Sequence, residues 1–500
     1  MGELLSQRGE VYFIGIKGTG MCALAELFFH SGLSVSGSDR SEVFYTDGIL
    51  RDLGIPFHEC FDAAHVPKGA ALAIHSAAYS IETNPEMARA RDLGIPLLKY
   101  TDALGAYSAL FDSSGIAGVH GKTTTTAMAG ALFRAAELPA RVLAGSAVSV
   151  FGGRSTLNLG DKYFAAETCE YRRHFLAFHP RRIILTSVES DHQDYFPAYA
   201  DIRDAFVEYV LRLPPGGALI YCADDPGAVE VADLVKHRRN DIDYIPYGFS
   251  AEDQYRIENY EVKDERTLFR FDGQIFSLRI PGRHCVLDAA AALVLTSLLV
   301  KEERGRWTAE QRRNAVLALE EFSGSRRRSE ILGEKGGVLF MDDYGHHPTA
   351  LRTTLQGLKE FYPRRRLIVS FMSHTYTRTA ALLDDFAASL LPADLVFLHK
   401  IYASAREVYT GGINGRTLFE KTREVFSKQK PEALPGSPVF YTEEPEAAAE
   451  QLKDILREGD LFITMGAGDN WRLGQKLFAG LNTVPEGTGS RGAGPQGAGS

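Results

Sequence analysis

The sequence predicts an α/β protein of three domains, and three observations carry this prediction. The chain has 500 residues, which is enough for about three domains of ordinary size. Short apolar runs alternate with helical patterns along the chain, as in parallel sheets covered by helices. Two glycine-rich turns, beginning at Gly15 and Gly118, each follow an apolar run and open a helical pattern.

Composition narrows the class of protein further. Apolar residues make up 45% and charged residues 24% of the chain, which is typical of a soluble globular protein. The net charge of -9 gives no support for a nucleic-acid or anionic-membrane partner. The five cysteines are scattered, without a C-x-x-C pair, and no apolar signal core opens the sequence. We therefore expect a cytoplasmic protein with no nucleic-acid and no membrane partner.

The first predicted domain covers residues 1–106 and is Rossmann-like. It begins with a strand at 11–14 and a helix at 21–30, continues with strands at 71–74 and 95–98, and leads out through a helix at 101–111. Its turn reads G-x-x-G-x-G from Gly15 to Gly20, with Asp39 following 19 residues later. Because Lys17 occupies the place of the second glycine in the dinucleotide pattern, we expect a nucleotide diphosphate ligand and not a nicotinamide dinucleotide.

The second predicted domain, residues 107–322, carries the strongest motif. The run Gly118-Val119-His120-Gly121-Lys122-Thr123-Thr124 follows an apolar strand at 116–118 and opens a helix at 124–136. Its glycines let backbone N–H groups approach phosphate oxygens, and Lys122 adds a positive charge. The Thr123 hydroxyl is placed to ligate Mg²⁺. Ile116 stands where the first glycine of the usual loop would be, yet the motif predicts a P-loop domain that binds a nucleoside triphosphate.

The remaining elements complete the second domain and form a third. Strands are expected at 163–166, 182–187 and 218–221, a hairpin over 268–280 with Asp272-Gly273 at its turn, and helices at 286–300 and 308–319. The third domain, residues 323–482, is Rossmann-like and follows a hinge at Ser323-Gly324. We expect its strands at 338–341, 367–371, 395–398 and 461–464, and its helices at 349–361 and 378–391. Residues 483–500 are rich in Gly, Ser and Pro and are predicted to be a disordered tail.

Charged clusters at predicted strand ends are candidates for a metal site and a phosphate clamp. The segments 166–170 and 189–194 supply oxygen ligands near the triphosphate, and we select Glu167 and His192. The run Arg326–Arg328, just past the hinge, is interpreted as a clamp that closes on phosphate. Two histidines near two aspartates at 342–347 are not expected to bind zinc, because adjacent residues rarely ligate one ion and no third ligand is spaced nearby.

Seven motifs in this order resemble those of the Mur ligases. They are Gly118–Thr124, Ser187–Asp194, Pro281–His284, Arg326–Arg328, Asp342–Thr349, Ser373–Thr379 and Thr464–Trp471. The resemblance implies that the first domain holds UDP-N-acetylmuramate, the second holds ATP with Mg²⁺, and the mobile third receives the amino acid. The implied reaction activates the carboxylate of UDP-N-acetylmuramate as an acyl phosphate, which L-alanine then attacks, in peptidoglycan precursor synthesis. We expect a monomer or a weak homodimer.

The resemblance also implies a role for each matched residue. The catalytic residues would be Lys122, Arg327, Asp343, His346 and Arg378. ATP would contact the loop residues Gly118, Val119, His120, Gly121, Lys122, Thr123 and Thr124, with His284 near the adenine. Thr123, Glu167 and His192 would ligate magnesium. The UDP substrate would contact Gly15, Gly18, Thr19, Gly20, Ser38, Asp39, His75 and Ser76.

Three departures from the family pattern keep alternatives open. Cys285 and Asp288 stand where the family has asparagines, and Thr375 stands where an arginine is frequent. No lysine occurs from 163 to 235, which favours the alanine-adding branch over members with a carbamylated lysine. The alternatives are a Mur ligase that adds glycine, serine or a recycled tripeptide, and a P-loop binding protein without ligase activity. A dehydrogenase is disfavoured by Lys17 and the triphosphate loop.

Overall fold

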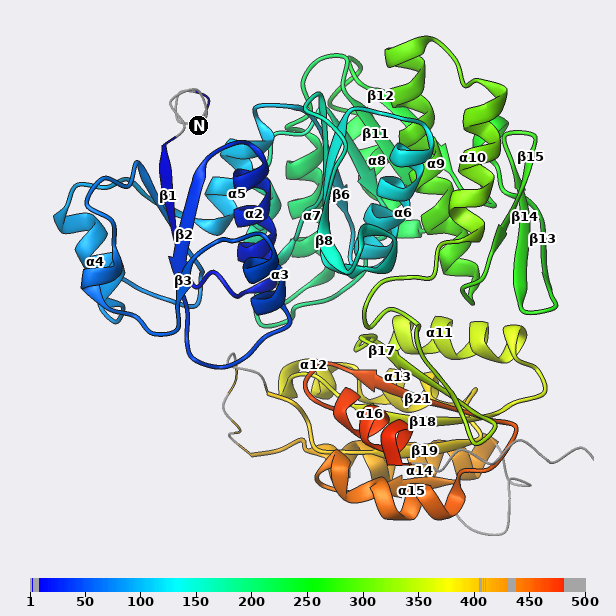
Figure 1. Cartoon of the computed structure of the whole chain (residues 1–500). Coiled ribbons are helices and arrows are strands. Elements are labelled where there is room, and N and C mark those ends of the chain that lie inside the picture. Colours follow the sequence, from blue (N-terminus) through cyan, green and yellow to red (C-terminus); the bar gives the residue numbers. More distant parts are fainter. Residues whose placement is uncertain are drawn as a thin grey trace, which may run out of the picture.

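The first sheet lies at the N-terminal end of the molecule and is entirely parallel. A computed structural model describes residue 2 and residues 9–403, 407, 409, 411–429 and 438–480, so the predicted tail lies outside the described residues. The strand order is β3-β2-β1-β4-β5 (Figure 1). The elements are β1 Glu10–Ile14, α2 Thr19–His30, β2 Ser34–Ser38, α3 Thr46–Asp52, β3 Phe57–His58, η1 Ala63–His65, β4 Leu72–His75, α4 Pro85–Asp92, β5 Leu97–Lys99 and α5 Tyr100–Ser108.

The middle domain contains a seven-stranded sheet of order β12-β11-β10-β6-β9-β7-β8, in which only β8 pairs antiparallel. A separate antiparallel sheet, β13-β14-β15, contains the predicted hairpin, with Phe271 opposite Gln274. The elements are β6 Asp112–Ala117, α6 Lys122–Ala135, β7 Ala140–Val148, η2 Ser149–Phe151, β8 Arg154–Asn158, β9 Tyr163–Glu167, η3 Tyr171–Ala177, β10 Arg182–Leu185, α7 Tyr199–Val210, β11 Ala218–Cys222, α8 Pro226–Lys236, β12 Asp243–Tyr247, η4 Asp253–Tyr255, β13 Glu258–Lys263, β14 Arg266–Phe271, β15 Gln274–Leu278, α9 Arg283–Arg304 and α10 Ala309–Glu320.

The third domain lies below the middle domain in Figure 1, with a six-stranded sheet of order β16-β17-β21-β18-β19-β20. Its elements are β16 Glu330–Lys335, β17 Val338–Asp343, α11 Pro348–Phe361, β18 Arg366–Met372, α12 Tyr376–Ala381, α13 Leu383–Ser389, β19 Leu395–Leu398, α14 Gly415–Gln429, β20 Val439–Tyr441, η5 Pro445–Ala448, α15 Ala449–Ile455, β21 Asp460–Gly466 and α16 Trp471–Gly480. The prediction of one helix over 378–391 is wrong. The chain leaves helical geometry at Leu382, which separates α12 from α13.

Alternating side chains place a core on each face of these sheets. In β1, Val11 and Phe13 belong to one hydrophobic cluster, whereas Tyr12 and Ile14 belong to another. This alternation is the two-residue period of a strand that is covered on both faces. Helix α9 is long and apolar enough to cross a membrane, but 72% of its most apolar stretch is buried in the middle domain. Helix α9 is therefore a core helix of the middle domain.

The first two domains share one hydrophobic cluster, whereas the third has its own. Tyr107 of α5 packs against Phe28 of α2 and Phe164 of β9, with ring centroids 5.3 Å apart in both pairs. The predicted boundary after residue 106 thus falls inside α5, which contacts both sheets. The two clusters of the third domain contain only residues of that domain among their buried members.

Candidate functional site

The glycine-rich loop between β6 and α6 needs glycine at two positions. Gly118 has φ 138° and Gly121 has φ 80°, both in a region that residues with a side chain rarely adopt. A Cβ at Gly118 would lie 2.0 Å from Thr186 Oγ1, and one at Gly121 would lie 2.4 Å from Asp288 Oδ1. The loop therefore brings its backbone close to its neighbours and points the N-terminus of α6 at the space beside it, a geometry suited to phosphate.

Lys122 is held at this loop by a buried carboxylate. Its Nζ donates to Glu170 Oε2 at 2.9 Å and to the Val119 carbonyl at 3.3 Å, and it also contacts the Gly118 carbonyl. Burial disfavours both charges, but the pairing outweighs it, which raises the pKa of Lys122 and lowers the pKa of Glu170. Both groups are therefore charged at neutral pH. From the sequence, the segment 166–170 is expected to supply metal ligands and Glu167 is selected from it, whereas the partner of Lys122 is Glu170.

A cavity of about 460 Å³ opens beside the loop, between the middle and third domains. Most of the predicted ATP, metal and catalytic residues line it: Val119, His120, Gly121, Lys122, Thr123, Thr124, Glu167, His192, His284, Asp343 and His346. His284 Nδ1 is buried without a hydrogen-bond partner among the described residues. Burial lowers the pKa of His284, so a neutral imidazole faces the cavity.

The three predicted metal ligands lie on this cavity and offer suitable atoms. Thr123 Oγ1 donates to Glu167 Oε2 at 2.7 Å. His192 has a left-handed backbone, φ 54°, and its ring packs 4.8 Å from that of Tyr171. Its Nε2 lies 3.3 Å from Glu170 Oε1, and its buried Nδ1 has no partner in the described part of the chain. A hydroxyl, a carboxylate and an unused imidazole nitrogen form a donor set that fits a divalent cation.

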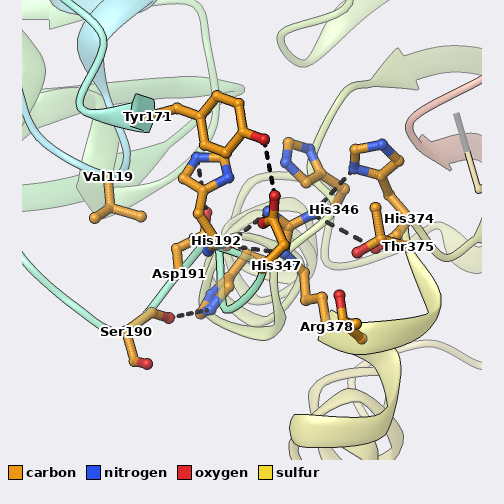
Figure 2. Close-up of polar contacts among 12 residues, drawn as sticks. Val119, Tyr171, Ser190, Asp191, His192, His346, His347, His374, Thr375 and Arg378 are labelled. Carbon is orange, nitrogen blue, oxygen red and sulfur yellow. Dashed lines mark hydrogen bonds and ion pairs between the residues drawn. The ribbon is translucent and has the colours of Figure 1, made fainter. Parts of the chain in front are cut away.

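A buried ion pair joins the middle domain to the third (Figure 2). Arg378 of α12 donates from Nε and Nη2 to Asp191 Oδ1, at 2.9 and 2.6 Å, and its Nη1 lies 3.0 Å from His374 Nδ1. Arg378 is 3% and Asp191 4% exposed. Burial opposes the charge on Asp191, but Arg378 prevails and holds the pKa of that carboxyl well below its usual value. The role of Arg378 toward the reacting groups stays a prediction, and in this structure its Nε and Nη2 bind Asp191.

The loop after β17 places Asp343 and His346 at the cavity. Asp343 accepts N–H groups from Ser329 at 2.7 Å and Gly345 at 2.6 Å, so its carboxylate is fixed by backbone. His346 Nδ1 lies 2.8 Å from the Tyr344 carbonyl, which assigns the proton to Nδ1 and leaves Nε2 as an acceptor. Loss of hydration and the nearby Arg378 lower the pKa of His346 well below its usual value, so its ring is neutral.

Of the three consecutive arginines, Arg327 and Arg328 both place the guanidinium group over the Tyr344 ring, 5.0 and 5.3 Å from its centroid, whereas Arg326 lies over Tyr45. Arg327, the one selected from the sequence, binds Asp342 at 2.9 Å and the carbonyls of Gly466 and Gly468 at 2.8 and 3.2 Å. These contacts lie within the third domain, and Arg327 does not line the cavity. Arg328 does line it. The assignment of the γ-phosphate contact to Arg327 stays a prediction, and Arg328 is a second candidate because it lines the cavity.

A second cavity, of about 330 Å³, lies between the first two domains. Gly18, Thr19, Gly20 and Ser76 of the predicted UDP site line it. Four other predicted residues do not: Gly15, Ser38, Asp39 and His75. The two cavities share two wall residues, Glu167 and Cys169.

The predicted ribose ligand and its neighbouring lysine are engaged inside the first domain. Asp39 Oδ2 accepts the N–H of Lys17 at 2.7 Å, which fixes the glycine-rich turn. Lys17 Nζ is fully buried and lies 3.1 Å from Asp47. The Lys17–Asp47 ion pair joins residues 30 positions apart, and no sequence pattern predicts it. Because its charge is neutralised by Asp47, Lys17 is not available to bind a phosphate group.

Asp288 gives the cavity beside the glycine-rich loop a pH-dependent group. Its side chain accepts a hydrogen bond from Thr125 Oγ1 at 3.0 Å, and burial raises the pKa of Asp288 to about 7. Because this pKa lies above the unfolded value, the stability that the protonated acid contributes is present below about pH 4 and is lost as the pH rises through 7. We expect the free energy of unfolding to fall by about 3 kcal/mol from this group between about pH 5 and pH 8.

The variant Asp288→Asn should lack this loss, because the amide keeps the shape without the charge. Denaturant unfolding of both proteins across that pH range measures the difference. The exposed Asp384→Asn is the control, with a pH profile like that of the parent. Parallel profiles for Asp288→Asn and the parent would contradict the assignment.

The fold and site together define a P-loop protein of the α/β class, in which the cavity beside the glycine-rich loop adjoins a second cavity. Three family models match the chain in sequence: the Mur ligase family catalytic domain at 10–112, the Mur ligase middle domain at 116–296, and the Mur ligase glutamate ligase domain at 327–468. The chain belongs to the Mur ligase family.

Relatives and solved structures agree with this assignment. The UDP-N-acetylmuramate–L-alanine ligase of Treponema pallidum is 51% identical over 94% of this chain and 96% of its own. The ligase of the same name from Borreliella afzelii is 37% identical over 93% and 97%. The crystal structure of UDP-N-acetylmuramate–alanine ligase from Thermotoga maritima has a TM-score of 0.72 at 23% identity, and the match covers 94% of this chain and 98% of that one. This last likeness concerns the fold, and it supports the predicted three-domain α/β architecture.

Proposed function

We propose that the protein is an ATP-dependent ligase that joins L-alanine to the carboxylate of UDP-N-acetylmuramate in peptidoglycan precursor synthesis. The observation that carries this proposal is the common wall of the two cavities at Glu167 and Cys169. A carboxylate that enters from the first-domain side thereby meets a phosphate held at the loop. The names of the relatives supply the identity of the substrates. We further propose that the enzyme acts in the cytoplasm, as a monomer or weak homodimer.

The chemistry proceeds in two transfers. A carboxylate oxygen attacks the γ-phosphorus of ATP, ADP leaves, and an acyl phosphate forms. The amine of L-alanine then attacks the carbonyl carbon, phosphate leaves, and an amide remains. Thr123, Glu167 and His192 would hold a Mg²⁺ ion, which neutralises charge on the phosphoryl group.

The protein's own groups position the reactants and exclude water. Lys122, now on Glu170, is placed to shift to the phosphates when ATP occupies the loop. His346 Nε2, free to accept a hydrogen bond, is suited to orient the ammonium group of the amino acid. The Asp191–Arg378 pair closes the third domain over the cavity, which protects an acyl phosphate from hydrolysis.

Phosphate release in the presence of Mg²⁺ and ATP tests the proposal. Release should require both UDP-N-acetylmuramate and an amino acid, added one at a time as L-alanine, glycine, L-serine or the recycled tripeptide. L-Alanine should give the highest kcat/KM. Phosphate release at the same rate without any amino acid would contradict a ligase, and preference for the tripeptide would assign the alternative activity.

Arg328, the cavity-lining arginine, should contribute to phosphoryl transfer. Its guanidinium stacks 5.3 Å from the centroid of the Tyr344 ring at the cavity wall. We expect Arg328→Ala to lower kcat about 100-fold, the usual cost of losing one charge-stabilising donor. Steady-state phosphate release measures this effect, and Arg352→Ala, on an exposed position of α11, is the matched control. An unchanged kcat in Arg328→Ala would remove this residue from the site.

A further inference from the structure

Three side chains with metal-ligating atoms meet where the middle and third domains face each other, apart from the proposed magnesium ligands. They are His120 of the loop, Glu189 of the segment after β10, and His347, which precedes α11. One ligand atom from each lies within 4.8 Å of the other two. His347 Nδ1 is 3.5 Å from Glu189 Oε1, and His120 Nε2 contacts the same oxygen. All three line the cavity beside the glycine-rich loop, where His120 belongs to the residues expected to contact ATP, and the proposed ligase reaction assigns no role to Glu189 or His347.

Hydrogen bonds to neighbouring residues fix the tautomer of His347 and leave one oxygen of the Glu189 carboxylate available to a metal ion. His347 Nε2 lies 3.3 Å from the Ser190 carbonyl (Figure 2), so that nitrogen carries the proton and Nδ1 keeps its lone pair. The Thr349 N–H donates to this Nδ1 over a long 3.4 Å contact that caps the start of α11, which requires the same tautomer, and a bound metal would take the place of this contact. Glu189 Oε2 accepts the Thr349 hydroxyl at 2.8 Å, which leaves Oε1 for the two imidazoles. Such second contacts are the usual companions of metal ligands.

The protonation states and the access also suit a cation. Burial lowers the pKa of His347, so its imidazole is neutral at neutral pH. Burial opposes the charge on Glu189, but the hydrogen bond from His120 outweighs it and lowers the pKa of Glu189, so the carboxylate is charged. A cation bound at His120 Nε2 would displace the proton of that hydrogen bond and take over its role beside the carboxylate. The His120 and Glu189 side chains are each 28% exposed, which leaves one side open to a water molecule.

We propose that His120, Glu189 and His347 bind a transition-metal cation of the Zn²⁺ class, with water as the fourth ligand. This reverses the expectation from the sequence that the histidines at 342–347 bind no zinc, because two of the ligands reach His347 only through the fold. Two imidazole nitrogens and one carboxylate favour Zn²⁺ over Mg²⁺. Tetrahedral zinc places such ligand atoms about 3.3 Å apart, so the widest pair closes by at most about 1.5 Å through side-chain rotation. His120 and Glu189 belong to the middle domain and His347 to the third, so the bound ion tethers the phosphate loop to the third domain.

Metal titration of the full-length protein tests this site without any substrate. The protein is treated with chelator and returned to excess Mg²⁺, which occupies the oxygen-rich site, and Zn²⁺ is added in a calorimeter. We expect one equivalent of Zn²⁺ to bind. Co²⁺ in place of Zn²⁺ should give the intense visible absorption of a tetrahedral complex. His347→Gln should weaken Zn²⁺ binding at least about tenfold.

Two further variants locate the bound metal. His120→Gln should weaken zinc binding as His347→Gln does, which serves as the second test if one variant folds poorly by circular dichroism. His192→Gln should keep the full zinc affinity, because it removes only a proposed magnesium ligand. Unchanged zinc affinity in the folded His120 and His347 variants, or loss of zinc in His192→Gln, would overturn the proposal. These results do not depend on ligase activity, so they stand apart from the test of the proposed function.

Discussion

Replacement of Lys122 by alanine should lower kcat for phosphate release at least about 1000-fold. Lys122 is the charged group of the loop, and its side chain, 12% exposed, lies where the α6 N-terminus meets the cavity. Loss of one charge-stabilising group at a transferring phosphoryl group typically costs 100- to 1000-fold. The loss is expected to be at the upper end of that range, because Glu170 then faces the phosphates without its cation.

The control for this variant is Lys162→Ala, which removes a lysine–glutamate ion pair of the same kind at the surface. It should retain kcat. Thermal unfolding of both variants separates a catalytic effect from a folding defect, since Lys122→Ala leaves Glu170 without its ammonium partner. A folded Lys122→Ala protein with near-normal kcat would mean that the loop does not hold the reacting phosphate.

The second large effect is expected at the ion pair between domains. Arg378→Met leaves Asp191 buried and unpaired, which costs about 3–5 kcal/mol in comparable sites. Because the third domain has its own core, we expect this cost to open the domain contact before it unfolds the chain. Small-angle scattering should show a larger radius of gyration, and kcat should fall at least about 100-fold because the cavity loses one wall.

The double variant Asp191→Asn, Arg378→Met distinguishes charge from geometry. Removing the second charge relieves the desolvation of the orphaned carboxylate, so the double variant should regain part of the compact form. It should not regain kcat. A radius of gyration unchanged in Arg378→Met would show that this ion pair does not hold the third domain in place.

Much of the fold could be predicted because its signals are local. The apolar runs at Val11–Ile14 and Leu395–Leu398, and the Asp272-Gly273 turn, each lie where an element or turn was expected. The break at Leu382 could not be predicted, because no glycine or proline marks it and the helical pattern continues across it. The two short helices contact different parts of the protein. Arg378 of α12 binds Asp191 of the middle domain, whereas Phe386 of α13 packs in the core of the third domain.

The sequence motifs predict which segments contribute to the site, but not which charged side chains pair with one another there. The glycine-lysine loop is a contiguous pattern, so its cavity was expected from the sequence. The partners of its charged groups were not, because Glu170 and Asp191 reach Lys122 and Arg378 only through the folded chain. Of three adjacent arginines, Arg328 lines the cavity, and no pattern in the sequence distinguishes it from its two neighbours.

The contact between the first and second domains differs from the contact between the second and third. This difference determines the order in which the domains separate and unfold. The first contact is a continuous apolar core that includes Phe28, Tyr107 and Phe164, whereas the second combines the half-buried Val262, which packs on the third domain's core, with the Asp191–Arg378 ion pair. Apolar burial couples the first two domains into one cooperative folding unit. The third domain, with a complete core, can fold on its own timescale and dock afterwards. Synthesis from the N-terminus would therefore complete the shared core before the docking partner exists.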